Sequence, residues 1–394
     1  MAETERLWNK QYLRAWGANF TLFFAFMLLT PLLPIYLKER FSADKDAIGM
    51  VLSGYTWLTL CTRAVSGYLV DNFPRKTILR LAWILFTAMF AGYFVAGSLL
   101  LFFVIRTLHG SPFGLTTVSN STVAIDVLPL KRQSEGIGYY GLSNNLATAT
   151  APTVGLLVYQ HLHNFDLLFG MSMFVACIGF ILTYGIKLPE TTESRLHRTP
   201  FSPRRMFLLE GWSEGLSIAC FSFAYGVLVT YLAIYGQEEL GIVGGSGLFF
   251  ALLSLGLIVS RLTGTKGLRK GRVVENASHG VIISFFGYLL FAAVHNNLGY
   301  YGAALIIGFG NGHMFPAFQN MFINLAPVRM RGTANSTQLT AWDVGMGLGV
   351  LVGGIVAESM GYSSAFWMAW AVQGFGVLFF LLYGRKHFLR HRLR

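Results

Sequence analysis

The stretch Phe20–Leu37, FTLFFAFMLLTPLLPIYL, decides the class of fold because it runs for 18 residues without a charged side chain. A helix that crosses a lipid bilayer needs roughly 20 predominantly apolar residues. Phe366–Tyr383 is a second uncharged run of this kind. Over the chain, 54% of residues are hydrophobic and only 12% are charged, about half the charged fraction of a soluble domain. The sequence therefore predicts an all-α membrane protein.

The same length rule predicts twelve membrane-spanning helices. They cover residues 13–37, 47–70, 77–97, 99–126, 136–160, 166–186, 207–235, 244–265, 275–294, 298–325, 333–358 and 362–384. All three cysteines fall inside these segments, so we interpret them as small core residues and not as a disulfide framework.

The two halves of the chain match at a fixed offset of 198 residues. The matched pairs include Arg63 and Arg261, Pro129 and Pro327, Lys131 and Arg329, and Gly155 and Gly353. The repeat predicts two pseudo-symmetric six-helix bundles, residues 1–187 and 207–394, joined by a polar cytoplasmic linker at 188–206. Because six is even, the bundles have the same orientation and are parallel repeats about an axis along the membrane normal.

The positive charge is distributed unevenly along this map. Of the 30 Lys and Arg residues, 24 fall in the tails, the alternate loops and the adjoining span ends of one side. Only Lys38, Arg40 and Lys45 fall on the other side, and three, Arg63, Arg106 and Arg261, lie deeper inside spans. This is the positive-inside pattern, which predicts that both termini are cytoplasmic. We interpret the basic tail 385–394 as a topology anchor near anionic lipid, and expect no nucleic-acid partner.

The loop after the second span reads GYLVDNFPRK, from Gly67 to Lys76. Asp71, at a helix end, can accept hydrogen bonds from the N-terminus of a neighbouring helix, whose dipole favours an anion. Arg75 can bridge to a second carboxylate, for which Asp126 at the end of the fourth span is the candidate. The alternative is an ordinary solvated turn.

This loop resembles the signature loop of the major facilitator superfamily, although Pro74 stands where that family usually has Gly. In the family, such a cluster latches the cytoplasmic side during transport. The resemblance therefore implies a gating set consisting of Gly67, Asp71, Arg75, Lys76 and Asp126.

Two further stretches resemble signatures of the same family. Arg106-Thr-Leu-His109-Gly110-Ser-Pro-Phe-Gly114 matches the family's second signature. An arginine inside a span should face a polar cavity or a partner; His109 is either a proton carrier or a hydrogen-bonded packing residue. Ala147–Gly155, with Ala151, Pro152 and Gly155, is similar to the antiporter motif of drug and metabolite exporters, or is a Pro-kinked packing helix. Pro129–Ser143 looks like the corresponding stretch of small bacterial exporters.

Asp343 is the principal candidate for proton coupling. It lies ten residues after Thr333, about 15 Å along a helix and close to the bilayer midplane. An ionisable residue at that depth is a functional-site hypothesis; the alternative is a carboxylate permanently paired with an arginine. Glu214 is a second candidate nearer the cytoplasmic end, and Arg106 is expected to tune a carboxylate or bind an anionic group.

Polar and aromatic residues inside the spans are candidates for lining a ligand cavity. They are Asn19, Tyr139, Asn144, Asn145, Asn311, Gln319 and Trp342. The chain has no phosphate-binding loop, no zinc-binding motif and no credible Ser-His-Asp arrangement. We therefore expect neither an enzyme nor a metal site, and no cofactor.

Together these observations predict a secondary active transporter that works by alternating access. The leading hypothesis is a proton-coupled antiporter that exports small amphipathic or organic molecules. The alternative is an importer or facilitator of a small metabolite with the same fold, and a receptor or intramembrane enzyme is a third class. We expect a monomer in a bacterial inner membrane, with protons as the coupling ion and lipid as its surroundings.

Overall fold

The computed structural model describes residues 6–43, 45–188, 206–242 and 245–393, and within these ranges the regular structure is entirely helical. Most of the predicted linker 188–206 lies outside the described residues. The chain divides into two compact units. Unit 1 contains residues 1–136, 140–207 and 329–336, and unit 2 contains residues 137–139, 208–328 and 337–394.

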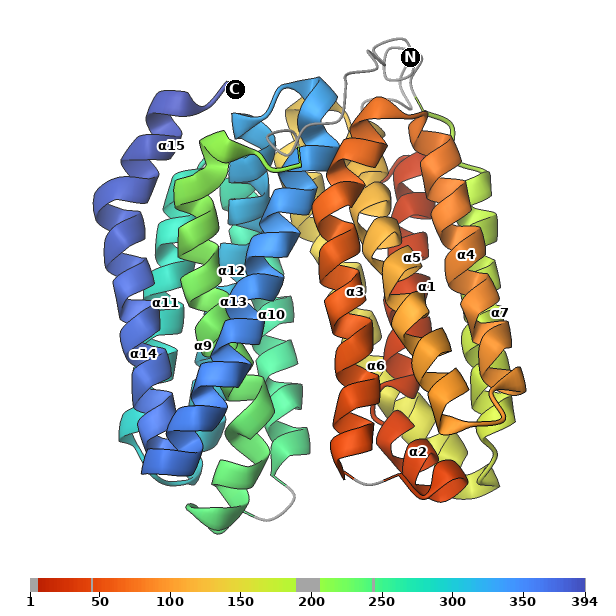
Figure 1. Ribbon diagram of the computed structural model, residues 1–394. Helices are drawn as coiled ribbons and strands as arrows, with labels where there is room; N and C mark the ends of the chain where they lie inside the picture. Colours follow the sequence, from red (N-terminus) through yellow and green to blue (C-terminus); the bar gives the residue numbers. More distant parts are fainter. Residues whose placement is uncertain (1–5, 44, 189–205, 243–244, 394) are drawn as a thin grey trace. The chain divides into compact units, whose positions relative to one another are not determined.

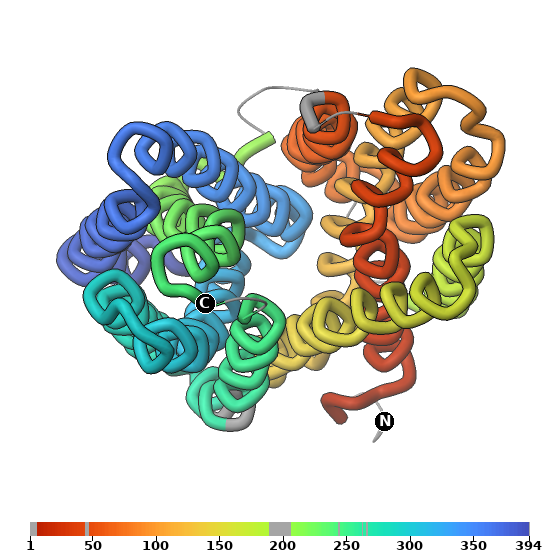
Figure 2. Tube along the Cα trace, turned by 90° about the horizontal axis from the view of Figure 1, so that it is seen from below, coloured from red at the N-terminus to blue at the C-terminus, as the bar shows by residue number. Residues whose placement is uncertain are grey.

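Unit 1 is built from helices that run side by side in Figure 1 and are seen nearly end-on in Figure 2. They are α1 (Lys10–Leu29), α2 (Leu33–Phe41), α3 (Lys45–Asn72), α4 (Arg75–Val95), α5 (Leu99–Asp126), η1 (Leu130–Arg132), α6 (Gln133–Leu162) and α7 (Phe165–Tyr184). Asn9, Ser98 and Asn164 begin α1, α5 and α7, because each side chain accepts hydrogen bonds from first-turn N–H groups that lack a helical partner.

Unit 2 repeats this architecture with the helices of the second half. They are η3 (Leu209–Gly211), α9 (Trp212–Glu238), α10 (Ser246–Arg269), α11 (Val273–Ala293), α12 (Asn297–Leu325), η4 (Val328–Met330), α13 (Arg331–Met360), α14 (Tyr362–Phe379), the π-helical turn η5 (Phe380–Gly384) and α15 (Arg385–His391). Arg329–Ser336, which contains the first residues of α13, groups with unit 1.

The 198-residue repeat is visible in the helix pairing of each unit. In unit 1, α3 and α4 pack on α5, and α7 packs on α1 and α4. In unit 2, α10 and α11 pack on α12, and α14 packs on α9 and α11. Each helix pair in one unit therefore has its counterpart in the other.

Glycine makes the closest of these helix contacts possible in both units. A Cβ on Gly110 of α5 would collide with the Tyr55 carbonyl and lie 2.8 Å from the Thr59 hydroxyl of α3. At the repeat-equivalent position, a Cβ on Gly308 of α12 would collide with the Leu253 carbonyl of α10. Lipid gives no hydrophobic drive for helix association, so small residues that allow close backbone approach stabilise such crossings.

The structure differs from the predicted spans at the two ends of the chain. The predicted span 13–37 is two helices, α1 and α2, because Pro31 and Pro34 lack the N–H groups that a continuous helix needs. At the other end of the chain, the predicted span 362–384 covers α14 and η5, and α15 continues the helix into the basic tail.

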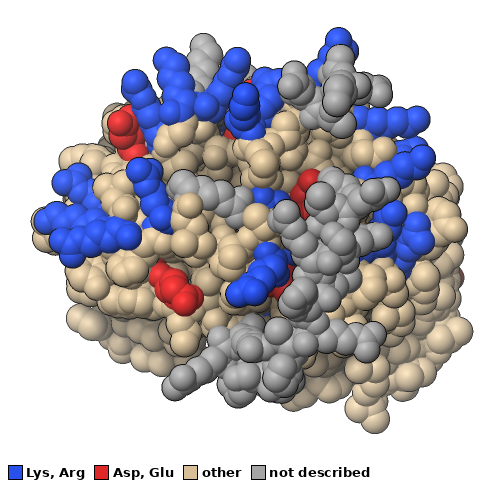
Figure 3. Space-filling model, turned by 90° about the horizontal axis from the view of Figure 1, so that it is seen from above, with Lys and Arg blue, Asp and Glu red and all other residues tan. Residues whose placement is uncertain are grey.

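Eight helices among the described residues are long and apolar enough to cross a membrane. The remaining long helices, α3, α6, α10 and α12, are not among these eight, so the count of twelve spans stays a prediction. The face drawn in Figure 3 shows many more Lys and Arg than Asp and Glu side chains. On α15, Arg385, Lys386 and Arg390 are exposed.

Candidate functional site

Asp71, at the last turn of α3, caps the N-terminus of α13. The backbone N–H of Gly332 donates to its Oδ1 at 2.8 Å, and the backbone N–H of Thr333 donates to its Oδ2 at 2.7 Å. The Thr333 hydroxyl donates a third bond to Oδ2 at 2.8 Å. The first N–H groups of a helix have no internal partner and carry the positive end of the dipole, so a carboxylate there stabilises the helix start.

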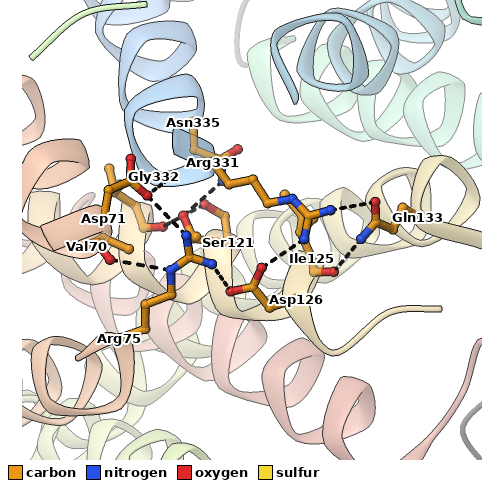
Figure 4. A network of polar contacts seen from close by, with 12 residues as sticks. Val70, Asp71, Arg75, Ser121, Ile125, Asp126, Gln133, Arg331, Gly332 and Asn335 are labelled. Atoms are coloured by element: carbon orange, nitrogen blue, oxygen red, sulfur yellow. Dashed lines mark hydrogen bonds and ion pairs between the residues drawn. The ribbon is translucent and has the colours of Figure 1, made fainter. Parts of the chain in front are cut away.

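Arg75 connects this cap to a second carboxylate. Its Nη2 lies 3.2 Å from Oδ1 of Asp71, and its Nη1 contacts Oδ2 of Asp126 (Figure 4). The other oxygen of Asp126 accepts a bond of 2.9 Å from Nη1 of Arg331. Asp126 is only 8% exposed, so two guanidinium groups compensate one buried carboxylate. We call Asp71, Arg75, Asp126, Gln133 and Arg331 the α13 anchor.

Sequence reasoning missed Arg331 and Gln133. Nη2 of Arg331 donates to Oε1 of Gln133 at 2.9 Å, and Nε2 of Gln133 donates to the Ile125 carbonyl at 3.2 Å. The two residues are 198 positions apart, so they are repeat equivalents of one another. The offset itself was the available signal, because it pairs Gln133 with Arg331 as equivalent positions.

Gly67 allows α13 to approach α3. A Cβ at this position would lie 2.6 Å from the Thr333 Cα and 2.8 Å from the Ser336 Cβ. A real Cβ does not tolerate such distances, so Gly67 supports the α13 anchor through packing and not through hydrogen bonds. Lys76, the remaining member of the predicted gating set, is half-buried at the start of α4.

Arg106 and His109 on α5 lie together in the core of unit 1, linked by Tyr93 of α4. Nη1 of Arg106 donates to the Tyr93 hydroxyl at 3.0 Å, and that hydroxyl is 2.7 Å from Nδ1 of His109. The His109 ring is surrounded by Phe86, Phe90 and Tyr55, with ring centroids 4.7–6.0 Å away. This arrangement favours the interpretation of His109 as a hydrogen-bonded packing residue.

Glu214 and Asp343, both in unit 2, differ in how deeply they are buried. Glu214, in the first turn of α9, is fully buried, and its Oε1 lies 3.3 Å from Nδ1 of His387 on α15. Asp343 is half-buried on α13. Beside it, the Trp342 ring packs on Tyr225 and Phe315, with centroids 5.7 and 5.2 Å away.

The other predicted residues fall into separate groups. A Cβ on Gly155 of α6 would collide with the Leu28 carbonyl of α1, which is a packing role, and Ala151 is fully buried. Pro152 is half-buried inside α6. Asn19 donates to the Ser143 hydroxyl at 2.8 Å and accepts from the Tyr140 hydroxyl at 2.8 Å.

Five of the cavity candidates lie on α6 and α12. Asn144 accepts a bond of 3.2 Å from the Thr148 hydroxyl, and Asn311 accepts one of 3.1 Å from the Ser284 hydroxyl. Tyr139 and Asn145 are half-buried. Gln319, the remaining candidate, is buried on α12. Among the described residues, no three His, Cys, Asp or Glu side chains form a group that could hold a metal ion.

Comparisons with known proteins place these features in one family. A family model described as Major Facilitator Superfamily matches residues 15–350, and again 279–393. The chain therefore belongs to the Major Facilitator Superfamily, and its fold is the all-helical membrane fold of that family.

Similar proteins are named as transport proteins. The staphylopine export protein of Staphylococcus aureus (strain Mu50 / ATCC 700699) is 22% identical over 91% of each chain. The quinolone resistance protein NorA of Staphylococcus aureus (strain MRSA252) is 23% identical over 95% of this chain and 96% of NorA. The human organic anion transporter MFSD10 (TETRAN) shares the fold, with a TM-score of 0.80 and 14% identity over 94% and 98% of the two chains. The chain is a multi-pass integral membrane transporter of small molecules, and not an enzyme.

Proposed function

We propose that this transporter is a proton-coupled antiporter that exports small amphipathic or organic molecules by alternating access. Two full-length relatives with exporter or resistance names support the direction of transport. The absence of a phosphate-binding loop from the sequence favours an ion gradient as the energy source.

The observation that carries the proposal is the continuity of α13. This helix begins at Arg331, inside the α13 anchor, and continues without interruption past Asp343 to Met360. Asp343 follows Arg331 by twelve residues, which is about 18 Å along the helix. A rigid helix that joins a releasable anchor to an ionisable group gives a physical route by which a proton on Asp343 biases the anchor.

In this scheme the α13 anchor is the gate, and its polar contacts break and reform in each transport cycle. Gly67 and Lys76 contribute packing and charge near the gate. Glu214 is the second proton site, with His387 as its partner. The protein works as a monomer in a bacterial inner membrane, with both termini cytoplasmic.

Purified protein in liposomes, with a pH-sensitive dye inside, tests the coupling. Addition of a cationic dye such as ethidium to vesicles with an imposed proton gradient should produce dye movement and dissipate the gradient. Asp343→Asn keeps the shape of the side chain but cannot exchange a proton, so dye movement should become independent of the gradient. Glu275→Gln, at an exposed ion pair, is the matched control and should behave as wild type. Wild-type coupling in Asp343→Asn would falsify the assignment.

The same vesicles decide between export and the alternative, import of a metabolite. Protein inserted in known orientation is identified by protease cleavage in the linker 188–206. Dye movement from the cytoplasmic face to the opposite face, while protons move in the other direction, supports export. Movement of substrate and protons in the same direction supports the importer hypothesis instead.

A further inference from the structure

Arg106 is a buried positive charge in the membrane-spanning helix α5, about 10 Å from the start of that helix at Leu99. Its side chain is 3% exposed. A guanidinium group stays charged at every accessible pH, and a charge inside the bilayer is costly without compensation. Among the described residues, no Asp or Glu forms an ion pair with Arg106.

Aromatic side chains from three helices surround this guanidinium in place of a carboxylate. Its Cζ lies over the Tyr55 ring of α3 at 4.1 Å and over the Phe26 ring of α1 at 5.4 Å. Tyr93 of α4 accepts the hydrogen bond from Nη1. Cation–π contact compensates part of the charge, but it does not use the N–H donors that point along the edge of the guanidinium plane.

The cluster has more hydrogen-bond donors than acceptors. Nε of Arg106 and the hydroxyl of Tyr55 are both buried without a hydrogen-bond partner. The Tyr93 oxygen accepts from Arg106, so its own proton is directed to Nδ1 of His109. Unpaired donors beside an uncompensated positive charge are the complement of a carboxylate, which only accepts.

We propose that Arg106 and Tyr55 bind the carboxylate of an organic anion, whose apolar body packs on Phe26 and Tyr55. The carboxylate accepts from Nε of Arg106 and from the Tyr55 hydroxyl, and it supplies the missing negative charge. This inference rests on the proposed function because it takes the ligand to be cargo, and it places organic acids among the molecules that the protein carries.

Binding to the purified full chain tests the proposal without any transport step. The probe is benzoate, compared with its neutral isostere benzamide and with chloride at equal ionic strength. Benzoate should raise the midpoint of thermal unfolding by mass action, whereas benzamide and chloride should not. An equal shift with benzamide shows that charge is not recognised, and an equal shift with chloride shows a small-ion site only; either result overturns the proposal.

Variants locate the site. Arg106→Gln should abolish the benzoate shift. Arg80→Gln is the matched control, because Arg80 also lies over a tyrosine ring, Tyr184 at 4.2 Å, but is more exposed. Tyr55→Phe keeps the ring and removes only the hydroxyl, so it remains informative if Arg106→Gln does not fold. It should weaken benzoate binding about tenfold. Unchanged binding in both site variants contradicts the proposal.

The outcomes of this test and of the coupling test are separable. A protein that binds benzoate through Arg106 but moves ethidium independently of the proton gradient keeps the anion site and loses the proposed coupling. A protein that couples protons to ethidium but ignores benzoate keeps the proposed function and loses the anion site.

Discussion

The α13 anchor and the repeat-equivalent positions of the second half lie on helices that pack in the same way, but their side chains differ in charge. Asp71, Arg75 and Asp126 correspond to Arg269, Val273 and Asn324. In unit 1 the three form a buried ion-pair network. In the second half, Arg269 is exposed, Val273 is buried, and the Asn324 carbonyl accepts a backbone bond of 2.8 Å from Leu393 of the tail. Duplication preserved the helix packing, and sequence divergence left the two carboxylates of the network, Asp71 and Asp126, without acidic counterparts in the second half.

The largest expected loss of stability comes from Asp126→Asn, which gives this position of the first half the residue that occupies position 324 in the second half. Asp126→Asn removes the carboxylate shared by Arg75 and Arg331 and leaves two buried guanidinium groups with less compensation. Loss of one partner of a buried pair costs about 3–5 kcal/mol. The free energy of unfolding of the purified protein measures it. Asn324→Ala is the control and should cost less than about 1 kcal/mol, because Asn324 bonds the tail through its backbone. Equal losses of unfolding free energy at positions 126 and 324 would contradict the proposed difference between the two halves.

Asp71→Ala should rank second. It removes the three bonds that Asp71 accepts from Gly332 and Thr333, and loss of a helix cap costs up to about 2 kcal/mol. It also removes the ion pair with Arg75, but Arg75 keeps Asp126 as a second carboxylate partner. Amide hydrogen exchange in the first turn of α13 should accelerate with it. Asp71→Asn keeps a capping oxygen and should lose less stability than Asp71→Ala. If the asparagine variant is as unstable as the alanine variant, the charge on Asp71 matters more than its cap.

Gln133→Leu measures what Gln133, which the sequence did not predict, contributes to the stability of the α13 anchor. The substitution removes the acceptor for Nη2 of Arg331 but leaves the ion pair with Asp126 in place. The expected cost is about 1–2 kcal/mol, because the bond that Nε2 of Gln133 donates to the Ile125 carbonyl is lost as well. Combining it with Asp126→Asn in a double-mutant cycle should reveal coupling, because both residues contact Arg331. Strict additivity would show that Gln133 does not position Arg331.

The smallest effect is expected at an exposed ion pair of the second half. Arg272 and Glu275 approach to 3.6 Å, but their side chains are 59% and 61% exposed. Glu275→Gln should therefore change the free energy of unfolding by less than about 0.5 kcal/mol, and high salt should erase that difference. A loss as large as that of Asp71→Ala would contradict the burial argument for the anchor.

The sequence was sufficient for the class of fold and for part of the anchor. Hydropathy and the repeat identified helical bundles, because bilayer thickness and helix rise fix the length of an apolar span. Asp71 lies at the end of one predicted span and Asp126 at the end of another, so the sequence indicated that Arg75 could bridge the two carboxylates.

Other parts of the molecule could not be predicted from local pattern. Arg331 and Gln133 meet only because two segments 198 residues apart are brought together, and no local periodicity encodes that contact. The Glu214–His387 pair likewise depends on contact between α15 and the first turn of α9, which are far apart in the sequence. The break between α1 and α2 was visible as two prolines, but the uninterrupted hydropathy of Phe20–Leu37 concealed it.

By itself, the sequence determined that this chain is a duplicated bundle of membrane helices of the Major Facilitator Superfamily, with unequal charges in its two copies. That follows because hydrophobicity, span length and residue spacing are properties of the chain alone. The tertiary structure decided which charges compensate each other. Asp126 has two guanidinium partners, whereas Arg106 has aromatic rings and no carboxylate among the described residues. Compensation depends on which helices lie side by side, because Coulombic and hydrogen-bond energies are set by distance in space and not by distance along the chain.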